Sequence, residues 1–300
     1  MDEDRTAGVL LGLACGDALG RPIEFETPAR ILAQYGEVTE MLANGTWGKP
    51  AGTVTDDTDM ALCLARSLVD CGGFDPDDVA ERFVAWYDAG PFDVGNMTAK
   101  ALSRIRDGES WETASQRVWE ESPEGSNAGN GSVMRAPPLA VALADDHSQL
   151  VEASETSSRI THADPRCTAG CAVLNLTLAG LLVGRADPLS DALGWLDPTA
   201  ALDDALRPVV TGDLDPSTLR STGYVVDTLQ TALWHGLHAD SPERALVDVV
   251  NMGGDADTVG AVTGAVVGAR FGASALPERW LAELDGRSEL RALATRLATR

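Results

Sequence analysis

Lysine is nearly absent from this 300-residue sequence, in which Lys49 and Lys100 accompany 21 arginines. Basic residues are outnumbered two to one, with 23 Lys and Arg against 46 Asp and Glu, and the formal net charge is −23. Proteins that bind nucleic-acid backbones present a basic face, so this composition argues against a nucleic-acid partner. The acidic excess occurs in both halves of the sequence and predicts a hydrated surface rather than an acidic tail.

Long apolar runs are absent too. No stretch of 18 consecutive apolar residues exists, so we expect no membrane-spanning helix and no membrane partner. The sequence starts with MDEDRTAG, which is acidic where a secretory signal is basic, and we therefore expect a cytoplasmic protein.

Cysteine is scarce, and its count is odd. The residues lie in apolar stretches, which predicts buried, reduced thiols rather than a disulfide framework. They are Cys15, Cys63, Cys71, Cys167 and Cys171. Cys167 and Cys171 are four residues apart, but no second Cys/His pair at zinc spacing follows, which argues against a zinc site.

Alternating β-strand patterns are also scarce, and apolar residues recur instead at spacings of three and four. These stripes lie at residues 9–14, 60–69, 79–86, 171–183, 224–237, 259–271 and 281–297. Asp-Pro and Ser-Pro pairs between them place proline in first helical turns. We therefore predict an all-α fold of about a dozen helices. No low-complexity linker or repeat divides the chain, which predicts one compact domain over residues 1–300.

Two acidic clusters precede strongly apolar helical stripes. One is TDDTD at residues 55–59, and the other is GGDADT at residues 253–258. An N-cap and the helix dipole explain one acid in each cluster, but not carboxylates and hydroxyls two and three deep before a buried helix. Burying several like charges without a counter-charge costs many kcal/mol or forces protonation. The clusters therefore favour a bound divalent cation.

The donor types in these clusters select among cations. Mg²⁺ and Mn²⁺ take carboxylate, hydroxyl and water oxygens, and two converging clusters would hold a pair of ions. Calcium is disfavoured because the 12-residue loop with its closing Glu is missing. The D-D-x-x-D pattern of a prenyl-diphosphate synthase would need an acid at position 60, where this chain has Met60.

Two further segments are rich in small residues. Gly12, Gly16 and Gly20 share one helix face and predict close packing against another backbone, and Glu24 follows just past that helix. The segment SNAGNGSVMR at residues 126–135 runs into a helix, and its backbone N–H groups would suit a phosphate, although an ordinary turn has the same composition.

Together these motifs resemble the ADP-ribosylglycohydrolase family, which includes the dinitrogenase-reductase-activating glycohydrolases and the ADP-ribosyl-acceptor hydrolases. The matching segments are GDALG at 16–20 with Glu24, TDDT at 55–58, GNGSVMR at 129–135, Thr161-His162, and GGDADTVG at 253–260. They follow the family's order between about residues 5 and 272. The resemblance implies an all-helical fold, two Mg²⁺ or Mn²⁺ ions, and cleavage of the bond between ADP-ribose and a modified side chain.

The resemblance also implies roles for individual residues. The implied metal ligands are Glu24, Thr55, Asp56, Asp57, Asp255, Asp257 and Thr258. The implied catalytic carboxylates are Glu24, Asp56 and, from the D-[IV]-G-x-x-T segment at 93–98, Asp93. The implied contacts to ADP-ribose are Asn127, Gly129, Asn130, Gly131, Ser132, Met134 and His162. Taken alone, His162 would be interpreted as a structural histidine.

The chemistry that the resemblance implies passes through an oxocarbenium-like state at the anomeric carbon, with a carboxylate such as Glu24 or Asp56 taking a proton from water. The expected partner is an ADP-ribosylated protein or a small ADP-ribose conjugate, acted on by a monomer. The acceptor side chain in such a protein is left open between arginine, serine and others. A small conjugate such as O-acetyl-ADP-ribose or ADP-ribose 1″-phosphate is an alternative substrate. A non-catalytic ADP-ribose-binding or crystallin-like structural protein is the second hypothesis. The acid-rich, lysine-poor surface further predicts a salt-adapted cytoplasm.

Overall fold

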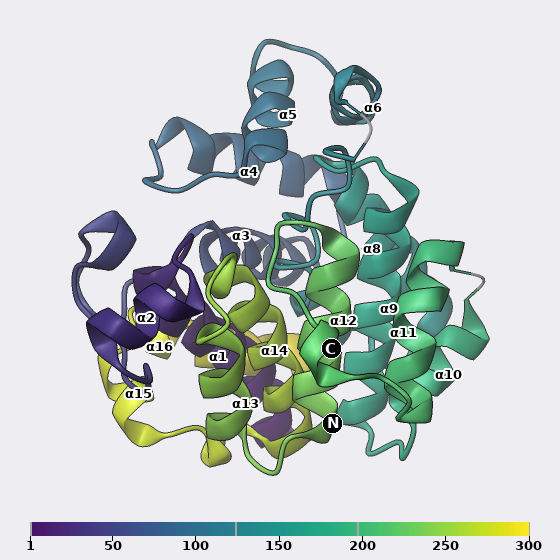
Figure 1. Cartoon of the computed structure of the whole chain (residues 1–300). Helices are drawn as coiled ribbons and strands as arrows, with labels where there is room; N and C mark the ends of the chain where they lie inside the picture. Colours follow the sequence, from purple (N-terminus) through teal and green to yellow (C-terminus); the bar gives the residue numbers. More distant parts are fainter. Residues whose placement is uncertain (1, 124, 197, 300) are drawn as a thin grey trace.

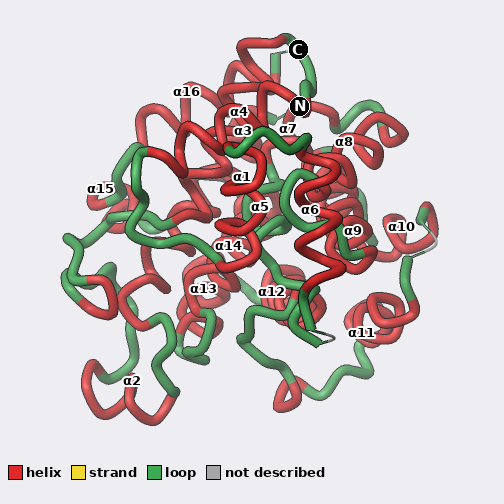
Figure 2. The backbone as a smooth tube through the Cα atoms, turned by 90° about the horizontal axis from the view of Figure 1, so that it is seen from above, coloured by secondary structure: helices red, strands yellow, loops and turns green. Residues whose placement is uncertain are grey.

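The computed structural model describes residues 2–123, 125–196 and 198–299. Within these ranges the chain forms sixteen α-helices and four 3₁₀ helices but no strand, and the isolated bridges Asn44–Lys49 and Gly129–Tyr224 are its β-type pairs. Figure 2 shows helices joined by loops throughout. The all-α prediction and the prediction of one compact domain are confirmed. Whether the domain's limits are residues 1 and 300 stays a prediction, because both termini lie outside the described residues.

The α-helices are α1 Glu3–Gly20, α2 Pro28–Tyr35, α3 Asp56–Cys71, α4 Pro76–Asp88, α5 Asn96–Arg106, α6 Trp111–Glu121, α7 Pro138–Leu143, α8 His147–Arg159, α9 Pro165–Leu182, α10 Pro188–Trp195, α11 Ala200–Thr211, α12 Val225–His238, α13 Pro242–Val250, α14 Ala256–Phe271, α15 Glu278–Glu283 and α16 Arg287–Ala298. The 3₁₀ helices are η1 Arg21–Ile23, η2 Gly45–Trp47, η3 Pro216–Thr218 and η4 Ala273–Ala275. The described residues thus hold more α-helices than the predicted dozen, because six-residue helices such as α7 and α15 are too short to show a period. The stripe at 281–297 is divided between α15 and α16.

The helices α1 and α14 form the antiparallel centre of the molecule (Figure 1). Their facing residues are Gly8 with Gly268, Gly12 with Gly264, Gly16 with Gly260, and Gly20 with Ala256. A Cβ on Gly12 would lie 2.1 Å from the Gly264 carbonyl oxygen, and one on Gly264 would lie 1.9 Å from the Gly12 oxygen. The predicted close packing of the glycine face is therefore confirmed, and it extends one turn further than the sequence indicated.

The remaining helices surround this pair. Helices α12 and α13 pack on α14, α16 packs on α1, and α4 to α6 form a group beside α3, at the top in Figure 1. Helix α9 is the one described helix that is long and apolar enough to cross a membrane, with a mean hydropathy of 1.2. It is 83% buried inside the protein, as a core helix is.

The cysteines are free thiols, and four of the five are buried as predicted. The prediction is wrong for Cys71, which is exposed. Cys71 is the last residue of α3 and is followed by Gly72, whose φ of +78° ends the helix at the surface. The apolar stripe of α3 therefore stops before this residue.

Candidate functional site

The antiparallel α1–α14 pair brings two of the predicted segments together. Gly20 at the end of α1 lies against Ala256 at the start of α14, so η1 carries Glu24 to the first turn of α14. Helix α3 begins beside the same point, because the carboxylate of Asp17 in the last turn of α1 accepts hydrogen bonds from the N–H groups of Thr55 and Thr58. The two acidic clusters thus meet at one end of the helix pair.

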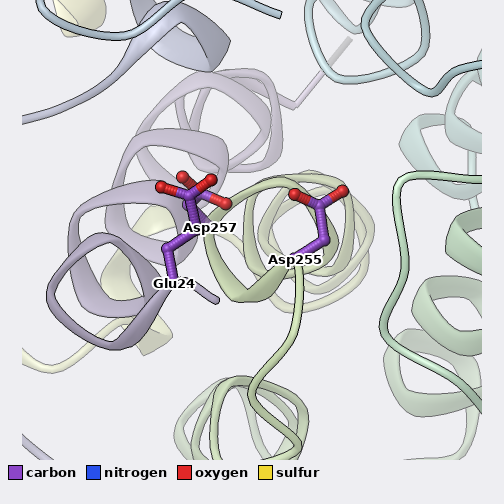
Figure 3. A group of neighbouring side chains, drawn as sticks. All are labelled: Glu24, Asp255 and Asp257. Atoms are coloured by element: carbon purple, nitrogen blue, oxygen red, sulfur yellow. The ribbon is translucent and has the colours of Figure 1, made fainter. Parts of the chain in front are cut away.

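Three carboxylates come close enough to share an ion. Glu24, Asp255 and Asp257 each offer an oxygen, and these three oxygens all lie within 4.8 Å of one another. Figure 3 shows Glu24 and Asp257 with their carboxylates turned toward each other and Asp255 beside them. They come from two segments about 230 residues apart in the sequence.

A second group of acidic and hydroxyl side chains from α1, α3 and α14 adjoins these three carboxylates. The Thr55 hydroxyl is 3.0 Å from oxygens of both Asp17 and Asp57, and the Thr258 hydroxyl donates to Asp57 Oδ2 at 3.3 Å. The other oxygen, Asp57 Oδ1, is buried and has no hydrogen-bond partner among the described residues. A buried carboxylate oxygen without a partner is costly in a folded protein unless a cation meets it.

The electrostatics of the cluster follow from burial of like charges. The pKa of Glu24 is raised to about 8, that of Asp56 to about 7 and that of Asp93 to about 8. Burial is the main cause in all three; the charge of Asp93 adds to the pKa of Glu24, and the charge of Asp56 adds to that of Asp93. The Gly95 N–H, which donates to Asp56 Oδ2 at 3.2 Å, opposes the shift at Asp56. Burial likewise raises the pKa values of Asp57, Asp255 and Asp257.

These observations fit a hard divalent cation. The donor set consists of carboxylate and hydroxyl oxygens, one buried oxygen lacks a partner, and the carboxylates raise one another's pKa. Mg²⁺, Mn²⁺ and Ca²⁺ all take such oxygen ligands. Positive charge placed here would relieve the repulsion that otherwise opposes ionisation.

The cluster forms one wall of a cavity of about 410 Å³. The lining includes the carboxylates Glu24, Asp56, Asp93, Asp255 and Asp257, the hydroxyls Thr98 and Thr258, the loop residues Ser126, Gly129, Asn130 and Gly131, and Phe25, Trp47, Met134 and His162. Most of the residues that the family resemblance implied therefore lie around one space.

Four of the implied residues lie behind the cavity wall. Thr55 and Asp57 sit beneath the cluster as described above. Asn127 and Ser132 hold the loop from behind: Asn127 Oδ1 accepts from Arg166, and the Ser132 hydroxyl accepts from Ser158. Inside the cavity, Asn130 Nδ2 donates to Asp255 Oδ2, which links the loop to the acidic cluster.

His162 supports the loop from below. It is 2% exposed, and burial, with the nearby Arg135 charge, lowers its pKa to about 3, so it is neutral. The Thr161 hydroxyl accepts from Arg135 Nη2 at 2.8 Å and lies 2.7 Å from His162 Nδ1. The other ring nitrogen, Nε2, faces the loop at Gly129 and Gly131. A Cβ on Gly131 would meet His162 Cε1 at 2.9 Å, which explains glycine there.

Several residues at the site were missed by the sequence analysis. Asp17, Trp47, Thr98 and Arg135 were assigned no role, yet Trp47 Nε1 donates to Glu24 Oε2 at 2.6 Å, and the buried Thr98 hydroxyl has no hydrogen-bond partner among the described residues. Three of them lie inside the segments that resemble the family, and that was the one signal in the sequence. Asp17 lies inside GDALG, Arg135 inside GNGSVMR, and Thr98 at the end of the segment at 93–98. Trp47 carries no such signal.

Arg21 is the fifth missed residue, and it explains how Trp47 reaches the site. Its guanidinium is fully buried and donates to four backbone carbonyls of one loop rather than to a carboxylate. The acceptors are Leu42, Asn44, Pro50 and Thr53. Arg21 thus fixes the loop that carries Trp47 beside Glu24.

Comparison with known proteins agrees with this geometry. The model of the ADP-ribosylglycohydrolase family matches residues 1–300. The ADP-ribosyl-[dinitrogen reductase] glycohydrolase of Rhodospirillum rubrum is 35% identical, over 96% of this chain and 92% of its own length. The ADP-ribosylarginine hydrolase Tri1 of Serratia proteamaculans is 33% identical, over 98% of this chain and 79% of its own.

A more distant relative and a solved structure extend the comparison. The ADP-ribosylhydrolase ARH3 of Bos taurus is 27% identical, over 98% of this chain and 92% of its own length. A solved structure titled "ADP-ribosylglycohydrolase-related protein complex" superposes with a TM-score of 0.81 at 36% identity, covering 99% of this chain and 98% of that one. The chain therefore belongs to the ADP-ribosylglycohydrolase family.

Proposed function

We propose that this protein is a metal-dependent hydrolase that cleaves the glycosidic bond between ADP-ribose and a modified acceptor. The observation that carries this proposal is the convergence of Glu24, Asp56, Asp93, Asp255 and Asp257 on one cavity. The names of the relatives, which are glycohydrolases and hydrolases of ADP-ribosyl groups, support the same reaction.

The proposed cofactors are two Mg²⁺ or Mn²⁺ ions. Their proposed ligands are Glu24, Thr55, Asp56, Asp57, Asp255, Asp257 and Thr258, of which Asp57 brings the oxygen that lacks a partner. When bound, two such ions supply positive charge that orients hydroxyl groups and lowers the pKa of water.

The chain's own carboxylates would move the protons. Glu24, held by the Trp47 N–H, and Asp56, held by the Gly95 N–H, are placed to accept a proton from the attacking water. Asp93 precedes α5 on the cavity wall, and we assign it the protonation of the leaving group. We assign the binding of ADP-ribose to the loop at residues 129–131 with Met134 and His162, all of which line the cavity.

For the acceptor we favour arginine over serine or acetate. The relatives named above include an ADP-ribosylarginine hydrolase. Two aromatic rings line the cavity: Trp47 lies with its ring centroid 6.4 Å from that of Phe25. A planar guanidinium stacks well on such rings and is attracted by the acidic cavity below them.

The test is release of ADP-ribose from three substrates, linked through arginine, serine or acetate, in Mg²⁺ or Mn²⁺ and in EDTA. We expect release from the arginine conjugate in the presence of metal and none in EDTA. Release of ADP-ribose from the serine or the acetate conjugate alone would show that arginine is not the acceptor. No release from any of them would favour the alternative, a non-catalytic ADP-ribose-binding or structural protein of this family.

We also propose that the protein is a monomer and that it works in a cytoplasm with a high salt concentration. The excess of Asp and Glu beside two lysines supports this, because carboxylates hydrate strongly and keep a protein dissolved in concentrated salt. The expected result is a melting temperature that rises between low and molar KCl, with a monomer mass in light scattering at both concentrations. A flat or falling melting temperature would contradict the salt adaptation.

A further inference from the structure

A second cavity of about 410 Å³ lies at the other end of the α1–α14 pair. Asp257 is in the first turn of α14 and Arg270 in the last, which separates the two cavities by about 20 Å along the helix. The second cavity is closed by the loop after α9, the start of α10 and the ends of α11 and α12, at the lower right of Figure 1.

Three arginines line this cavity, although acidic residues outnumber basic ones two to one in the sequence. Thirteen described arginines have a carboxylate oxygen within 4.0 Å. Arg5, Arg185 and Arg270 have none among the described residues, and all three line the cavity. Among the described lining residues Asp187 is the one carboxylate, so they carry a net positive charge although the chain carries −23.

Two of these guanidinium groups are held in place without using their full capacity. Arg5 Nη1 donates to the Leu181 carbonyl at 2.9 Å, and Arg270 Nη1 donates to the carbonyls of Gly236 and Ala239 at 3.2 and 2.8 Å. Their remaining N–H groups have no protein acceptor among the described residues. Backbone carbonyls thus orient these cations without neutralising them, as a preorganised anion site requires.

Arg185 connects the cationic cavity to a neighbouring one. Its exposed side chain makes no hydrogen bond or ion pair within the described part of the chain, and it lines both cavities together with Pro188. The neighbouring cavity, of about 380 Å³, is walled by Trp195, which is 56% exposed and packs edge-on against His147 with 5.4 Å between ring centroids. An exposed indole next to cationic groups offers a stacking surface for a planar ring.

We propose that Arg5, Arg185 and Arg270 form a second binding site, for the phosphate groups of a nucleotide-sized ligand whose base lies against Trp195. Guanidinium groups bind phosphate through paired N–H donors. The apolar residues Leu181, Leu189 and Val210 complete the cavity wall and suit the uncharged part of such a ligand. This site differs from the proposed hydrolytic site in position and in charge.

The test uses ADP and pyrophosphate as probes in EDTA, measured by calorimetry at low ionic strength. Chelating the metal leaves the carboxylates of the acidic cavity without a counter-charge, which disfavours both anionic probes there, and the variants below then assign the binding that remains. The exposed Arg185 is replaced in Arg185→Glu, and Arg291→Glu is the matched control because Arg291 is exposed and, among the described residues, likewise lacks an ion pair. We expect binding of both probes to the native protein and to Arg291→Glu, and at least tenfold weaker binding to Arg185→Glu.

A second variant separates the base from the phosphates. Trp195→Ala is expected to weaken ADP binding while leaving pyrophosphate binding unchanged, since Trp195 would contact the base and carries no group that binds phosphate. Absence of binding by the native protein, or equal affinities in Arg185→Glu and Arg291→Glu, would overturn the proposal. Self-association that Arg185→Glu abolishes, without binding of either probe, would instead assign the cavity to a second copy of this acidic chain. These readouts need no hydrolytic activity and stand apart from the test of the proposed function.

Discussion

The cavities at the two ends of the α1–α14 pair have linings of opposite charge, with five carboxylates in one and three arginines in the other. In α14, acids at the N-terminus and Arg270 at the C-terminus are favoured by the helix dipole. In α1 the N-cap Asp2 and the first-turn residues Glu3 and Asp4 suit the dipole as well, whereas the carboxylate of Asp17 lies in the last turn, where the dipole disfavours it. Helix stability therefore explains the charges of α14 and the acids at the start of α1, but not Asp17, which is explained by the hydrogen bonds that it accepts from Thr55 and Thr58 at the start of α3.

The glycine contacts make this possible. Because no side chain separates the two backbones, the end of α1 lies directly against the start of α14, and Asp17 reaches α3 while Glu24 reaches Asp257. The glycine contacts at the centre of the pair fix the relative positions of the side chains that line the two cavities.

The largest expected effect is at the acidic end. Asp257→Asn should lower kcat by on the order of 10³-fold, because it removes a proposed metal ligand that also faces Glu24. The same variant should melt at a higher temperature than the native protein in EDTA, since it removes one of several buried like charges. The control is Asp59→Asn, which lies in the same TDDTD motif but accepts from Trp86 outside the cavity and should keep its activity. Equal losses in both variants would contradict the assignment.

The next effect concerns the centre of the pair. Gly264→Ala places a Cβ 1.9 Å from the Gly12 carbonyl oxygen, so the helices must separate, at a cost of about 3 kcal/mol or more in the free energy of unfolding. Gly194→Ala is the matched control: a Cβ there has nothing within 4 Å, and alanine should stabilise helix α10 by about 0.5–1 kcal/mol. Urea titrations of both variants measure the difference. Similar stabilities would show that the glycine contacts do not hold the two ends in place.

A smaller effect is expected at the link between Glu24 and its loop. Trp47→Phe keeps an aromatic ring beside Phe25 and Phe92 but removes the N–H that donates to Glu24 Oε2. The loss of one hydrogen bond to a charged group predicts a fall of about tenfold in kcat with a small change in KM. Trp86→Phe removes the corresponding bond to Asp59 outside the cavity and should leave kcat unchanged. A KM effect alone would place Trp47 in binding rather than in positioning Glu24.

The smallest effect is a pH dependence of stability at His162. Its folded pKa of about 3 lies below the ordinary value of 6.5, so the unfolded chain binds more protons between these values. The contribution of His162 is therefore present above about pH 6.5 and is lost as the pH falls toward 3. His162→Gln should show a shallower fall in melting temperature between pH 7 and pH 5 than the native protein. Parallel curves would mean that His162 is not buried in its neutral form.

Much of the fold and part of the site were readable in the sequence. Long helices such as α9 and α14 carry enough turns for a period to show, and carboxylates stacked before an apolar helix indicated a cation because burial would otherwise be too costly. The glycine spacing of α1 indicated a close neighbour but not which helix it was. That partner lies about 250 residues away, and local patterns contain no information on it.

The missed residues share one property: their roles depend on contacts made across the fold. Asp17 could be recognised as a cap for α3 only once α1 and α3 were adjacent. Arg21 resembles a surface cation in the sequence, yet it is buried among backbone carbonyls. Asn127 and Ser132 belong to the loop motif, but their side chains point behind the wall because a loop has no period that fixes side-chain direction.

The measurement that tests the acidic end most directly is the stoichiometry of Mn²⁺ binding by calorimetry, in the native protein and in Asp57→Asn. Asp57 is chosen because its Oδ1 is buried without a partner among the described residues. Two ions per native chain, with at least one lost in Asp57→Asn, is the predicted result. No binding by the native protein, or the same two ions in the variant, would contradict the assignment of this cluster as a metal site.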